Sequence, residues 1–390
     1  MGYPFTLYDV AFLRSPAGEE ALAAAAGLAL IDASRLSDVD TVRRMVGPRL
    51  AAAVLETAVL RRRAASKVDG ADRWLFTGDA LQQASASPVA RHRASRLAGL
   101  DVHDVTCSVG VDLAALAAQA RRAVGSDLDP VRLAMAARNL RSSPAALLRA
   151  DALRPTSRGT VVYADPARRD STGRRRWRPA DFTPSLDALA TVYSGRPLVV
   201  KSAPGMDFGS APWAAEIELV SLDGEVREAC LWSARLATSG VARRATVLST
   251  SGPQWTVTDA DPADCPVRPP GEWLVNPDGA VVRAGLVRQY GARHGLGQLD
   301  QRIAYLTGDA PPPGVRAFRV LEHGHYSEKE LRATLHRLDA GTVEILVRGL
   351  DVDPNALRPR LRLRGSAAYT VVLTRIGRTP TAFICRPERA

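Results

Sequence analysis

The spacing of hydrophobic positions changes twice along the chain and divides it into three parts. Between residues 8 and 98 the segments are rich in alanine, and leucines recur at helical spacing, as in GEEALAAAAGLALI. Apolar residues that recur every three to four positions are typical of helices that bury one face. Strand-like alternation is absent from this region of the sequence. The pattern therefore predicts an all-helical N-terminal domain over residues 1–98.

A different pattern begins at residue 101, where short apolar runs alternate with helical segments. Strands are expected at 102–106, 123–127, 145–149, 160–164, 197–201, 215–221, 228–233 and 244–250, and helices near 111–121, 130–141 and 184–193. Strands that alternate with helices over short loops predict a mainly parallel, doubly wound sheet. The last strands follow one another without helices, which predicts an antiparallel element at one edge. We expect this α/β domain to span residues 99–258.

The remaining part of the chain follows a stretch rich in proline, aspartate and glycine at 259–273, which is typical of a linker. Residues 316–390 then show the order strand, helix, strand, helix, strand, strand. Ser327, with Glu330 three residues later, has the spacing of a capping box at the start of the first of these helices. The sequence therefore predicts a separate small α/β domain over 265–390.

Composition narrows the class of protein. The net charge of +11 at pH 7 favours an anionic partner, with nucleic acid first, although a basic bias of the whole proteome is an alternative. The four cysteines lie far apart, so we expect free thiols and no metal. The sequence shows no secretory signal pattern and no apolar run of the ~18 residues that a membrane span needs. A cytoplasmic protein without a membrane partner is expected.

Aspartates stand at the ends of successive predicted strands. Asp104 lies in the first strand, Asp127 ends the second 23 residues later, and Asp151 stands at the end of the third. Ligands of doubly wound sheets bind beyond the carboxyl ends of the strands, where a carboxylate can accept hydrogen bonds from a ribose diol. The turn DVTCSVGVD between these acids contains Gly110 but not the repeated glycines of a dinucleotide site. Any one of these acids alone could be a helix cap, but together they indicate a nucleoside-binding site.

At this point the sequence resembles the class I S-adenosylmethionine-dependent methyltransferases, over roughly residues 74–250. The segments that carry the resemblance are DVTCSVGVD, GSDLDPVRLAMAARN and ADPAR, preceded by FTGDALQQASASPVARHRA. It implies a Rossmann-like sheet with S-adenosyl-L-methionine as cofactor, with Asp104 and Gly110 at its methionine part, Asp127 at the ribose and Asp151 at the adenine. The predicted cofactor-binding set is completed by Thr106, Ser108, Leu128 and Ala152.

The segment VVYADPARRD is similar to the Asp-Pro-Pro-Tyr motif of amino-group methyltransferases. In that family the aspartate and a following carbonyl hold an amine for methyl transfer. Here alanine replaces the second proline and Arg168 replaces the aromatic residue, which leaves the chemistry of the acceptor open. An ordinary strand-ending turn is the alternative. The predicted catalytic residues are Asp165, Pro166, Arg168 and Lys201.

The same segment also resembles the Asp-Pro-Pro-Arg motif of RNA uracil C5-methyltransferases, which use a cysteine nucleophile after the next strand. In this chain the turn KSAPG places Ala203 at that position. A mechanism through a cysteine adduct is therefore disfavoured, and a nitrogen acceptor is favoured over carbon.

Two basic regions are candidates for RNA binding. The first follows the motif between residues 168 and 178, where a solvated loop is the alternative. The second lies in the C-terminal domain, which resembles the THUMP-like domain through VEILVRGLDVDPNALRPRLRLRG and AAYTVVLTRIG. THUMP domains capture RNA, and phosphate contacts make such binding strongly dependent on salt. The predicted RNA-binding residues are Arg169, Arg174, Arg175, Arg176, Trp177, Arg348, Arg358, Arg360, Arg362 and Arg364.

Together these patterns predict a methyltransferase that uses S-adenosyl-L-methionine and modifies an RNA base, in tRNA or rRNA, at a nitrogen. Two alternatives stay open. One is a methyltransferase for a small molecule or a protein, and the other is a catalytically inactive RNA-binding protein with a methyltransferase fold. The sequence does not indicate an oligomeric state.

Overall fold

The computed structural model describes residues 2–167, 181–252, 254–313 and 315–389. By packing, the chain divides into two compact units. The first contains the residues up to Ile217 together with Arg227–Thr238, and the second contains Glu218–Val226 and the residues from Ser239 onward. No helix among the described residues is long and apolar enough to cross a membrane.

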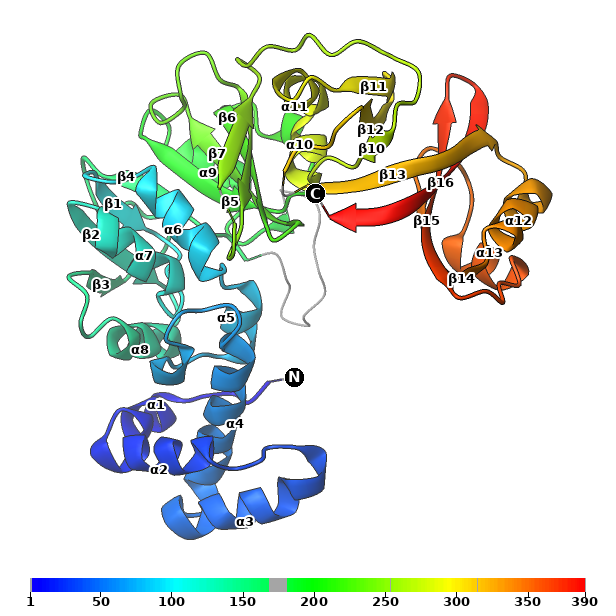
Figure 1. Ribbon diagram of the computed structural model, residues 1–390. Helices are drawn as coiled ribbons and strands as arrows, with labels where there is room; N and C mark the ends of the chain where they lie inside the picture. The colour runs from blue at the N-terminus through cyan, green and yellow to red at the C-terminus, as the bar shows by residue number, and fades with distance from the viewer. Residues whose placement is uncertain (1, 168–180, 253, 314, 390) are drawn as a thin grey trace. The chain divides into compact units, whose positions relative to one another are not determined.

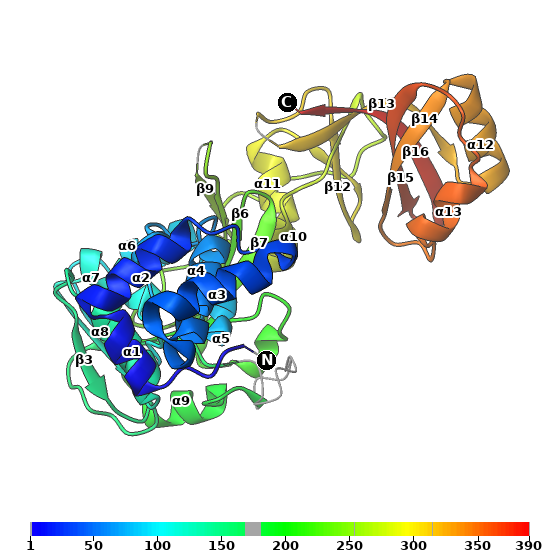
Figure 2. The ribbon, with the colours of Figure 1, turned by 90° about the horizontal axis from the view of Figure 1, so that it is seen from below.

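The first unit begins with helices, as the sequence predicts. They are α1 (Leu7–Leu13), α2 (Pro16–Ala26), α3 (Arg35–Val46), α4 (Pro48–Ala64), α5 (Gly78–Gln83) and α6 (Ser87–Ser95). Helix α1 starts with a reciprocal capping box between Thr6 and Asp9. Helix α2 can pack closely after α1 because residue 18 is glycine; a Cβ there would lie 2.0 Å from the carbonyl oxygen of Phe12. Helices α1 to α4 gather in one group (Figures 1 and 2).

A nine-stranded sheet follows, with its strands in the order β3-β2-β1-β4-β5-β7-β6-β8-β9. The first seven along the chain are β1 (Asp101–Asp104), β2 (Arg122–Asp127), β3 (Ala146–Arg149), β4 (Val161–Ala164), β5 (Leu198–Ser202), β6 (Ala214–Leu222) and β7 (Glu225–Ser233). The last two, β8 (Arg243–Leu248) and β9 (Trp255–Thr258), lie at one edge. Strands β1 to β5 pair in parallel, whereas β5 pairs with β7 in antiparallel orientation. The doubly wound sheet and its antiparallel edge are therefore confirmed.

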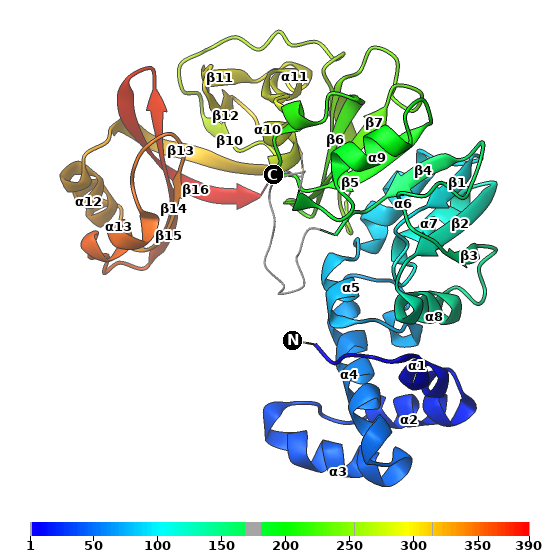
Figure 3. The same cartoon turned by 180° about the vertical axis from the view of Figure 1, so that it is seen from behind.

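Helices cover both faces of this sheet. They are α7 (Val111–Gln119), α8 (Pro130–Asn139) and α9 (Leu186–Val192), in addition to α6. Because side chains of a strand alternate between faces, Tyr163 of β4 packs with α6 and α7, and its neighbour Val162 packs with α9. Figure 1 shows α6 and α7 in front of the sheet, and Figure 3 shows α9 in front of it from the opposite side.

The N-terminal helices share one core with the turn after β1 and with α7 and α8. Val54 and Leu60 of α4 belong to the same buried cluster as Val109 and Val111, which follow β1, and Met135 of α8. The helical part is therefore packed against the elements that follow β1. The domain boundary near residue 98 stays a prediction, as does the boundary between 258 and 265.

The second unit contains a seven-stranded sheet in the order β11-β12-β10-β13-β16-β15-β14. Its strands are β10 (Trp273–Val275), β11 (Gly297–Asp300), β12 (Ile303–Gly308), β13 (Arg316–His325), β14 (Ala340–Val347), β15 (Ala367–Ile376) and β16 (Thr379–Arg389), and the unit also contains the antiparallel pair β8 (Arg243–Leu248) and β9 (Trp255–Thr258). Its helices are α10 (Gly279–Ala284), α11 (Val287–Arg293), α12 (Glu328–Arg337) and α13 (Pro354–Arg360).

Residues 316–389 of this unit follow the order that the sequence predicts. Strands β14 and β15 are parallel and are connected through α13, and β15 pairs with β16 in antiparallel orientation. Helices α12 and α13 lie on the same side of β14 and β15 in both Figure 1 and Figure 3. The side chain of Ser327 accepts a hydrogen bond from the backbone N–H of Glu330, as expected for the cap of α12.

Candidate active site

The turn after β1 has an unusual backbone. Ser108 has a φ of 50° and Gly110 a φ of 91°, so both residues are in the left-handed region. Glycine adopts this region without strain, whereas serine does not. A Cβ at residue 110 would also lie 2.9 Å from the Cδ1 of Leu140. The turn therefore needs glycine at residue 110 for two reasons. At residue 108 the backbone is strained, and this conformation points the N–H of Ser108 toward the end of β2.

Asp127, at the end of β2, accepts a hydrogen bond from that N–H. Its Oδ2 accepts a hydrogen bond from Ser108 N at 3.0 Å, and its Oδ1 accepts one from Asp129 N at 2.9 Å. A carboxylate offers about four lone-pair sites. Two protein donors thus fix the orientation of Asp127 and leave capacity for two further donors, such as the hydroxyls of a ribose.

The other two strand-end acids have different environments. Asp104 is 1% exposed, and burial, followed by the negative charge of Asp112, raises its pKa well above the usual range of an aspartate. Asp151, after β3, accepts a hydrogen bond from Leu153 N at 2.9 Å. Asp129, which follows Asp127, is a helix cap: its Oδ1 accepts from the first two free N–H groups of α8.

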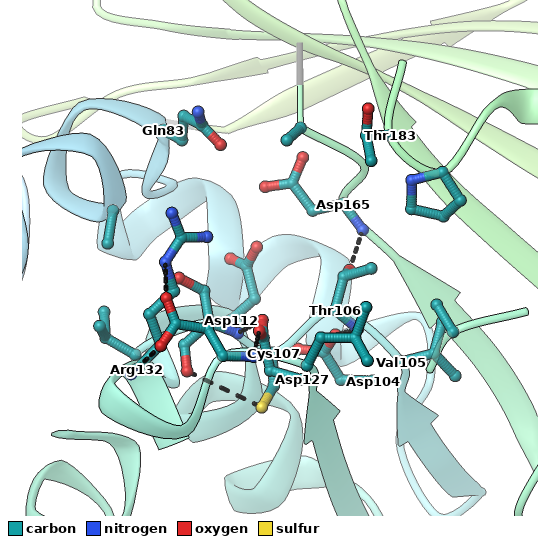
Figure 4. Close-up of a pocket in the computed structure, with 18 of the residues that line it drawn as sticks. Gln83, Asp104, Val105, Thr106, Cys107, Asp112, Asp127, Arg132, Asp165 and Thr183 are labelled. Atoms are coloured by element: carbon teal, nitrogen blue, oxygen red, sulfur yellow. Dashed lines mark hydrogen bonds and ion pairs between the residues drawn. The ribbon is translucent and has the colours of Figure 1, made fainter. Parts of the chain in front are cut away.

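These residues enclose a pocket of about 430 Å³, within the range of sites that hold a cofactor. Strands β1 and β4 are neighbours, and the chain winds away from them in opposite directions, so the pocket lies at the switch point where such sheets bind ligands. Figure 4 shows Asp104, Asp112 and Asp127 in one part of the pocket and Gln83, Asp165 and Thr183 in another. The second part lies beyond the end of β4.

Asp165 is fixed in that second part by two contacts, with Thr106 and with Lys201. Its backbone N–H donates to the hydroxyl of Thr106 at 2.7 Å. Its Oδ2 lies 2.6 Å from the Nζ of Lys201 on β5, which also donates to the backbone carbonyl of Gln83 at 3.2 Å. The Lys201 side chain is 4% exposed and that of Asp165 is 20% exposed. One buried ammonium group therefore joins the end of α5 to the carboxylate after β4.

A second buried group of charges supports this arrangement from the side of α6. Arg93 forms ion pairs with Glu228 and with Asp112, the latter at 2.6 Å. Tyr163 of β4 donates its hydroxyl to the other oxygen of Asp112 at 2.8 Å. Burial alone would raise the pKa of Asp112, but Arg93, Lys201 and this hydrogen bond lower it to about 2. Asp112 is therefore an ionised carboxylate in the wall of the pocket.

The opposite effect acts on Lys201. Burial alone would lower the pKa of its ammonium group, but the charges of Asp165, Asp112 and Glu228 outweigh burial and raise it. Lys201 is therefore a permanent cation, suited to hold Asp165 rather than to exchange protons.

The structure brings most of the predicted residues together. Those that line the pocket are Asp104, Thr106, Ser108, Asp127, Leu128, Asp151, Ala152 and Asp165. Gly110 shapes the turn after β1, Pro166 is buried, and Lys201 acts through Asp165; these three are outside the lining. Arg168 lies outside the described residues, as do Arg169, Arg174, Arg175, Arg176 and Trp177.

Sequence reasoning missed several polar residues that line the pocket, among them Gln83, Asp112, Arg132 and Thr183. Asp112 stands two positions after Gly110, so its place at the start of the helix could have indicated it. Gln83 lies within the segment that carries the family resemblance, but no spacing rule singles it out. Thr183 comes from a return of the chain, where it exchanges two backbone hydrogen bonds with Ala167.

The predicted RNA-binding arginines of the C-terminal domain differ in their contacts. Arg348 donates to the carbonyl of Ala304 and stacks over the ring of Tyr305. Arg360 pairs with Glu328 at 3.1 Å. The remaining three are Arg358, which donates to its neighbour Asn355, and Arg362 and Arg364, which line a pocket of their own.

A Rossmann-like sheet with carboxylates at three successive strand ends and an Asp-Pro turn at the fourth defines a nucleoside-binding α/β enzyme of the methyltransferase class. A protein of Mycobacterium tuberculosis described as an uncharacterized S-adenosylmethionine-dependent methyltransferase is 58% identical over 351 residues, which cover 86% of this chain and 97% of that protein. The chain belongs to the S-adenosylmethionine-dependent methyltransferases. Its cofactor is S-adenosyl-L-methionine.

Other comparisons concern separate parts of the chain and its fold. The family described as THUMP domain-like matches residues 315–387, and a domain of unknown function matches residues 6–64. The crystal structure of a protein from Porphyromonas gingivalis W83, assigned as a methyltransferase, superposes with a TM-score of 0.74 at 20% identity. It covers 95% of this chain and 98% of that one, so the likeness shows that the fold is shared over nearly the whole length.

The residues of the pocket fit this cofactor. Asp127 has free lone pairs for the ribose hydroxyls. The ionised carboxylate of Asp112 would stabilise a cationic ligand. A cation beside Asp104 would in turn favour the ionised form of its carboxyl, which burial disfavours. Among the described residues, no group of three or more His, Cys, Asp or Glu side chains is arranged to hold a metal ion.

Proposed function

We propose that this protein methylates a nitrogen of a base in RNA. The observation that carries the proposal is Asp165. Its carboxylate lies at the end of β4 in the cofactor pocket, with Oδ2 paired to Lys201, while Oδ1 has no partner among the described residues. An oriented carboxylate oxygen of this kind can accept a hydrogen bond from the N–H of an acceptor base.

Bound S-adenosyl-L-methionine supplies a methyl group that is ready for transfer. The chain's own contribution is to hold the acceptor nitrogen in line with that group. Such positioning can supply ~7–11 kcal/mol of the barrier when the reacting atoms are held ~3–3.5 Å apart. Because Lys201 and Thr106 fix Asp165 from two sides, its Oδ1 is a rigid reference point, and the nitrogen lone pair is directed away from it.

Two observations support RNA as the substrate. The C-terminal residues 315–387 match the THUMP-like family. The chain also carries a net charge of +11, which favours binding to a polyanion. A cytoplasmic location, where tRNA and rRNA are modified, belongs to the same proposal.

The test compares modified nucleosides in total RNA from cells with and without the protein. We expect one methylated nucleoside to be missing without it, and to return when purified protein and labelled S-adenosyl-L-methionine are added to that RNA. Asp165→Asn should abolish the labelling while calorimetry shows cofactor binding within threefold of wild type. An unchanged nucleoside profile, with no label transferred to RNA, would move the assignment to a small-molecule or protein acceptor, or to an inactive RNA-binding protein.

A further inference from the structure

A second pocket, in the THUMP-like region, has the chemistry of an anion site. It has a volume of about 370 Å³. The residues that line it are His336, Asp339, Ala340, Arg362, Arg364 and Gly365. Two arginines and one aspartate thus line the same hollow, so positive charge is in excess.

The two arginines of this pocket are available to a ligand. Neither the Arg362 nor the Arg364 side chain has an ion pair or hydrogen bond to any residue that the structure describes. Their neighbours in sequence are different, because Arg358 and Arg360 contact Asn355 and Glu328. Of the five arginines predicted to bind RNA in this domain, these two alone line the hollow.

The loop that carries them is fixed at its start by His336. The Nε2 of His336, at the end of α12, lies 3.1 Å from the carbonyl oxygens of both Leu361 and Arg362. Since both partners can only accept, Nε2 carries the hydrogen. Arg362 itself has a φ of 50°, a left-handed conformation that turns the chain at this point.

The end of the loop is fixed by residue 339. The carboxylate of Asp339 accepts hydrogen bonds from the N–H and the hydroxyl of Ser366, at 3.2 and 2.7 Å. These bonds lower the pKa of Asp339 and occupy one of its oxygens. Gly365 lies against the backbone of residue 339, where a Cβ would be 2.1 Å from the carbonyl oxygen. The loop is therefore held at both ends before any ligand binds.

Two arginines on one preformed loop offer the N–H donors with which guanidinium groups bind phosphate. We propose that this pocket binds a backbone phosphate of the RNA substrate. The inference rests on the proposed function for its choice of RNA, and it assigns the phosphate contact to Arg362 and Arg364 rather than to the whole basic surface. A free phosphate or a mononucleotide offers the same chemistry.

The test measures binding of a fluorescently labelled 12-nucleotide single-stranded RNA to the full chain, without cofactor, over a series of salt concentrations. The variant Arg362→Gln/Arg364→Gln should bind roughly tenfold more weakly at low salt. Its slope of log affinity against log salt should be shallower by about 0.7 for each phosphate that the variant no longer neutralises. The variant Arg362→Lys/Arg364→Lys keeps both charges, so it should keep the slope and lose affinity only in part.

The matched control is Arg375→Gln/Arg378→Gln. These exposed arginines flank the turn between β15 and β16, at the other end of β15 from the pocket, and their replacement removes the same charge from the same domain. The control should leave the slope unchanged. If the slope decreases equally in both glutamine variants, or in neither, then Arg362 and Arg364 do not form a specific phosphate site. The RNA would then be attracted by the positive charge of the protein as a whole.

Competition separates the sources of phosphate. Inorganic phosphate and AMP should displace the RNA only at millimolar concentration. If either competes at micromolar concentration while the Arg362/Arg364 variant still binds RNA normally, the pocket belongs to a small phosphate ligand, and the RNA assignment fails. Methyl transfer is measured separately: a chain that binds RNA through this pocket but transfers no methyl group would refute the proposed function and leave the pocket intact.

Discussion

The side chain of Asp127 is held by the backbone N–H groups of Ser108 and Asp129, so its unused lone pairs point in fixed directions. Hydrogen bonds to charged groups contribute about 1.5–3 kcal/mol each. We expect Asp127→Ala to weaken binding of S-adenosyl-L-methionine by roughly tenfold to a hundredfold or more. Isothermal titration calorimetry measures this directly.

A matched control is Asp187→Ala, which removes the same charge from an exposed position on α9 that does not line the pocket. It should bind the cofactor as the wild type does. Equal affinities for the Asp127 and Asp187 variants would show that the carboxylate after β2 does not contact the ribose.

Asp104 should lower the stability of the fold at neutral pH while it contributes to binding of the cofactor. Its folded-state pKa is raised, so its contribution to stability is lost as the pH rises from about 4 toward that pKa, and at pH 7 the carboxyl costs free energy. We expect Asp104→Asn to raise the free energy of unfolding at pH 7 by about 1 kcal/mol or more. The gain should shrink at pH 3, below the pKa of an aspartate in the unfolded chain, where the wild-type carboxyl is mostly protonated in both states.

Denaturant unfolding at both pH values, without cofactor, checks the stability of this variant, and calorimetry checks its affinity. The asparagine still presents an oxygen to Thr106 N, which Asp104 binds at 3.1 Å. A variant that is less stable at pH 7, or that binds the cofactor as tightly as the wild type, would contradict this account of Asp104.

At the scale of the element, the last two residues of β1 are both polar and point to opposite faces of the sheet. Asp104 faces the pocket, and the ring of His103 lies between the hydroxyls of Ser157 and Ser126, at 2.8 and 3.0 Å. Burial, followed by the charge of Arg196, lowers the pKa of His103 to about 4. The unfolded chain therefore binds a proton that the folded chain rejects between about pH 6.5 and 4, and stability falls as the pH falls through this window.

We expect His103→Gln to flatten this acid-side decrease, which can reach about 3 kcal/mol in the wild type. Urea unfolding at pH 7, 5.5 and 4.5 measures the slope. The exposed His325 serves as a control, since His325→Gln should leave the slope as it is. A parallel pH dependence in wild type and His103→Gln would rule out His103 as the cause.

Strand β5 connects two other elements through Lys201, which contacts both Asp165 after β4 and the carbonyl of Gln83 at the end of α5. Removing one partner of a buried ion pair typically costs about 3–5 kcal/mol, because a charge remains without its counterion. Lys201→Met should therefore destabilise the fold by about that amount. The double variant Lys201→Met/Asp165→Asn, which removes both charges, should recover much of the stability.

Chemical unfolding of the single and double variants forms a thermodynamic cycle that isolates this pair. Asp165→Asn alone serves as the third corner. If the double variant is as unstable as the sum of the two single variants, then the two groups do not interact, and another contact must hold Asp165 in place.

The elements themselves were largely predictable, because alternation of strands and helices is a local property of the sequence. The strand expected at 123–127 is β2 (Arg122–Asp127), and the helix expected near 130–141 is α8 (Pro130–Asn139). What could not be predicted is contact across the chain. In the sequence, nothing distinguishes Arg93 from other helical arginines. In the fold its side chain is 1% exposed and pairs with Glu228, 135 residues away. No local spacing encodes such a partner.

The same limit applies to the predicted RNA-binding surface. Five arginines in one basic stretch look alike in sequence, but a neighbouring glutamate, tyrosine or carbonyl occupies some of them in the fold. Only the tertiary structure separates an arginine that stabilises the domain from one that is free to bind a ligand.

For the whole molecule, the division into two compact units predicts two unfolding transitions. The cofactor pocket lies entirely within the first unit. A ligand at about a hundred times its dissociation constant adds about 2.7 kcal/mol to the stability of the unit that binds it. We expect S-adenosyl-L-methionine to raise the midpoint of one transition in differential scanning calorimetry and to leave the other unchanged.

The Asp127→Ala variant provides the control for this experiment, because it should show both transitions with no shift at the same cofactor concentration. A single transition that moves as a whole would mean that the two units unfold together. Calorimetry at several salt concentrations would then show whether the joint unfolding depends on electrostatic interactions.

The lining of the cofactor pocket contains six aspartates and one arginine among the residues that the structure describes. S-adenosyl-L-methionine carries a positive sulfonium, and methyl transfer converts it to a neutral thioether. The ionised carboxylates among them, such as that of Asp112, should therefore attract the reactant more strongly than the spent product. We expect each turnover to weaken the electrostatic hold on the bound molecule and so to favour release of the product.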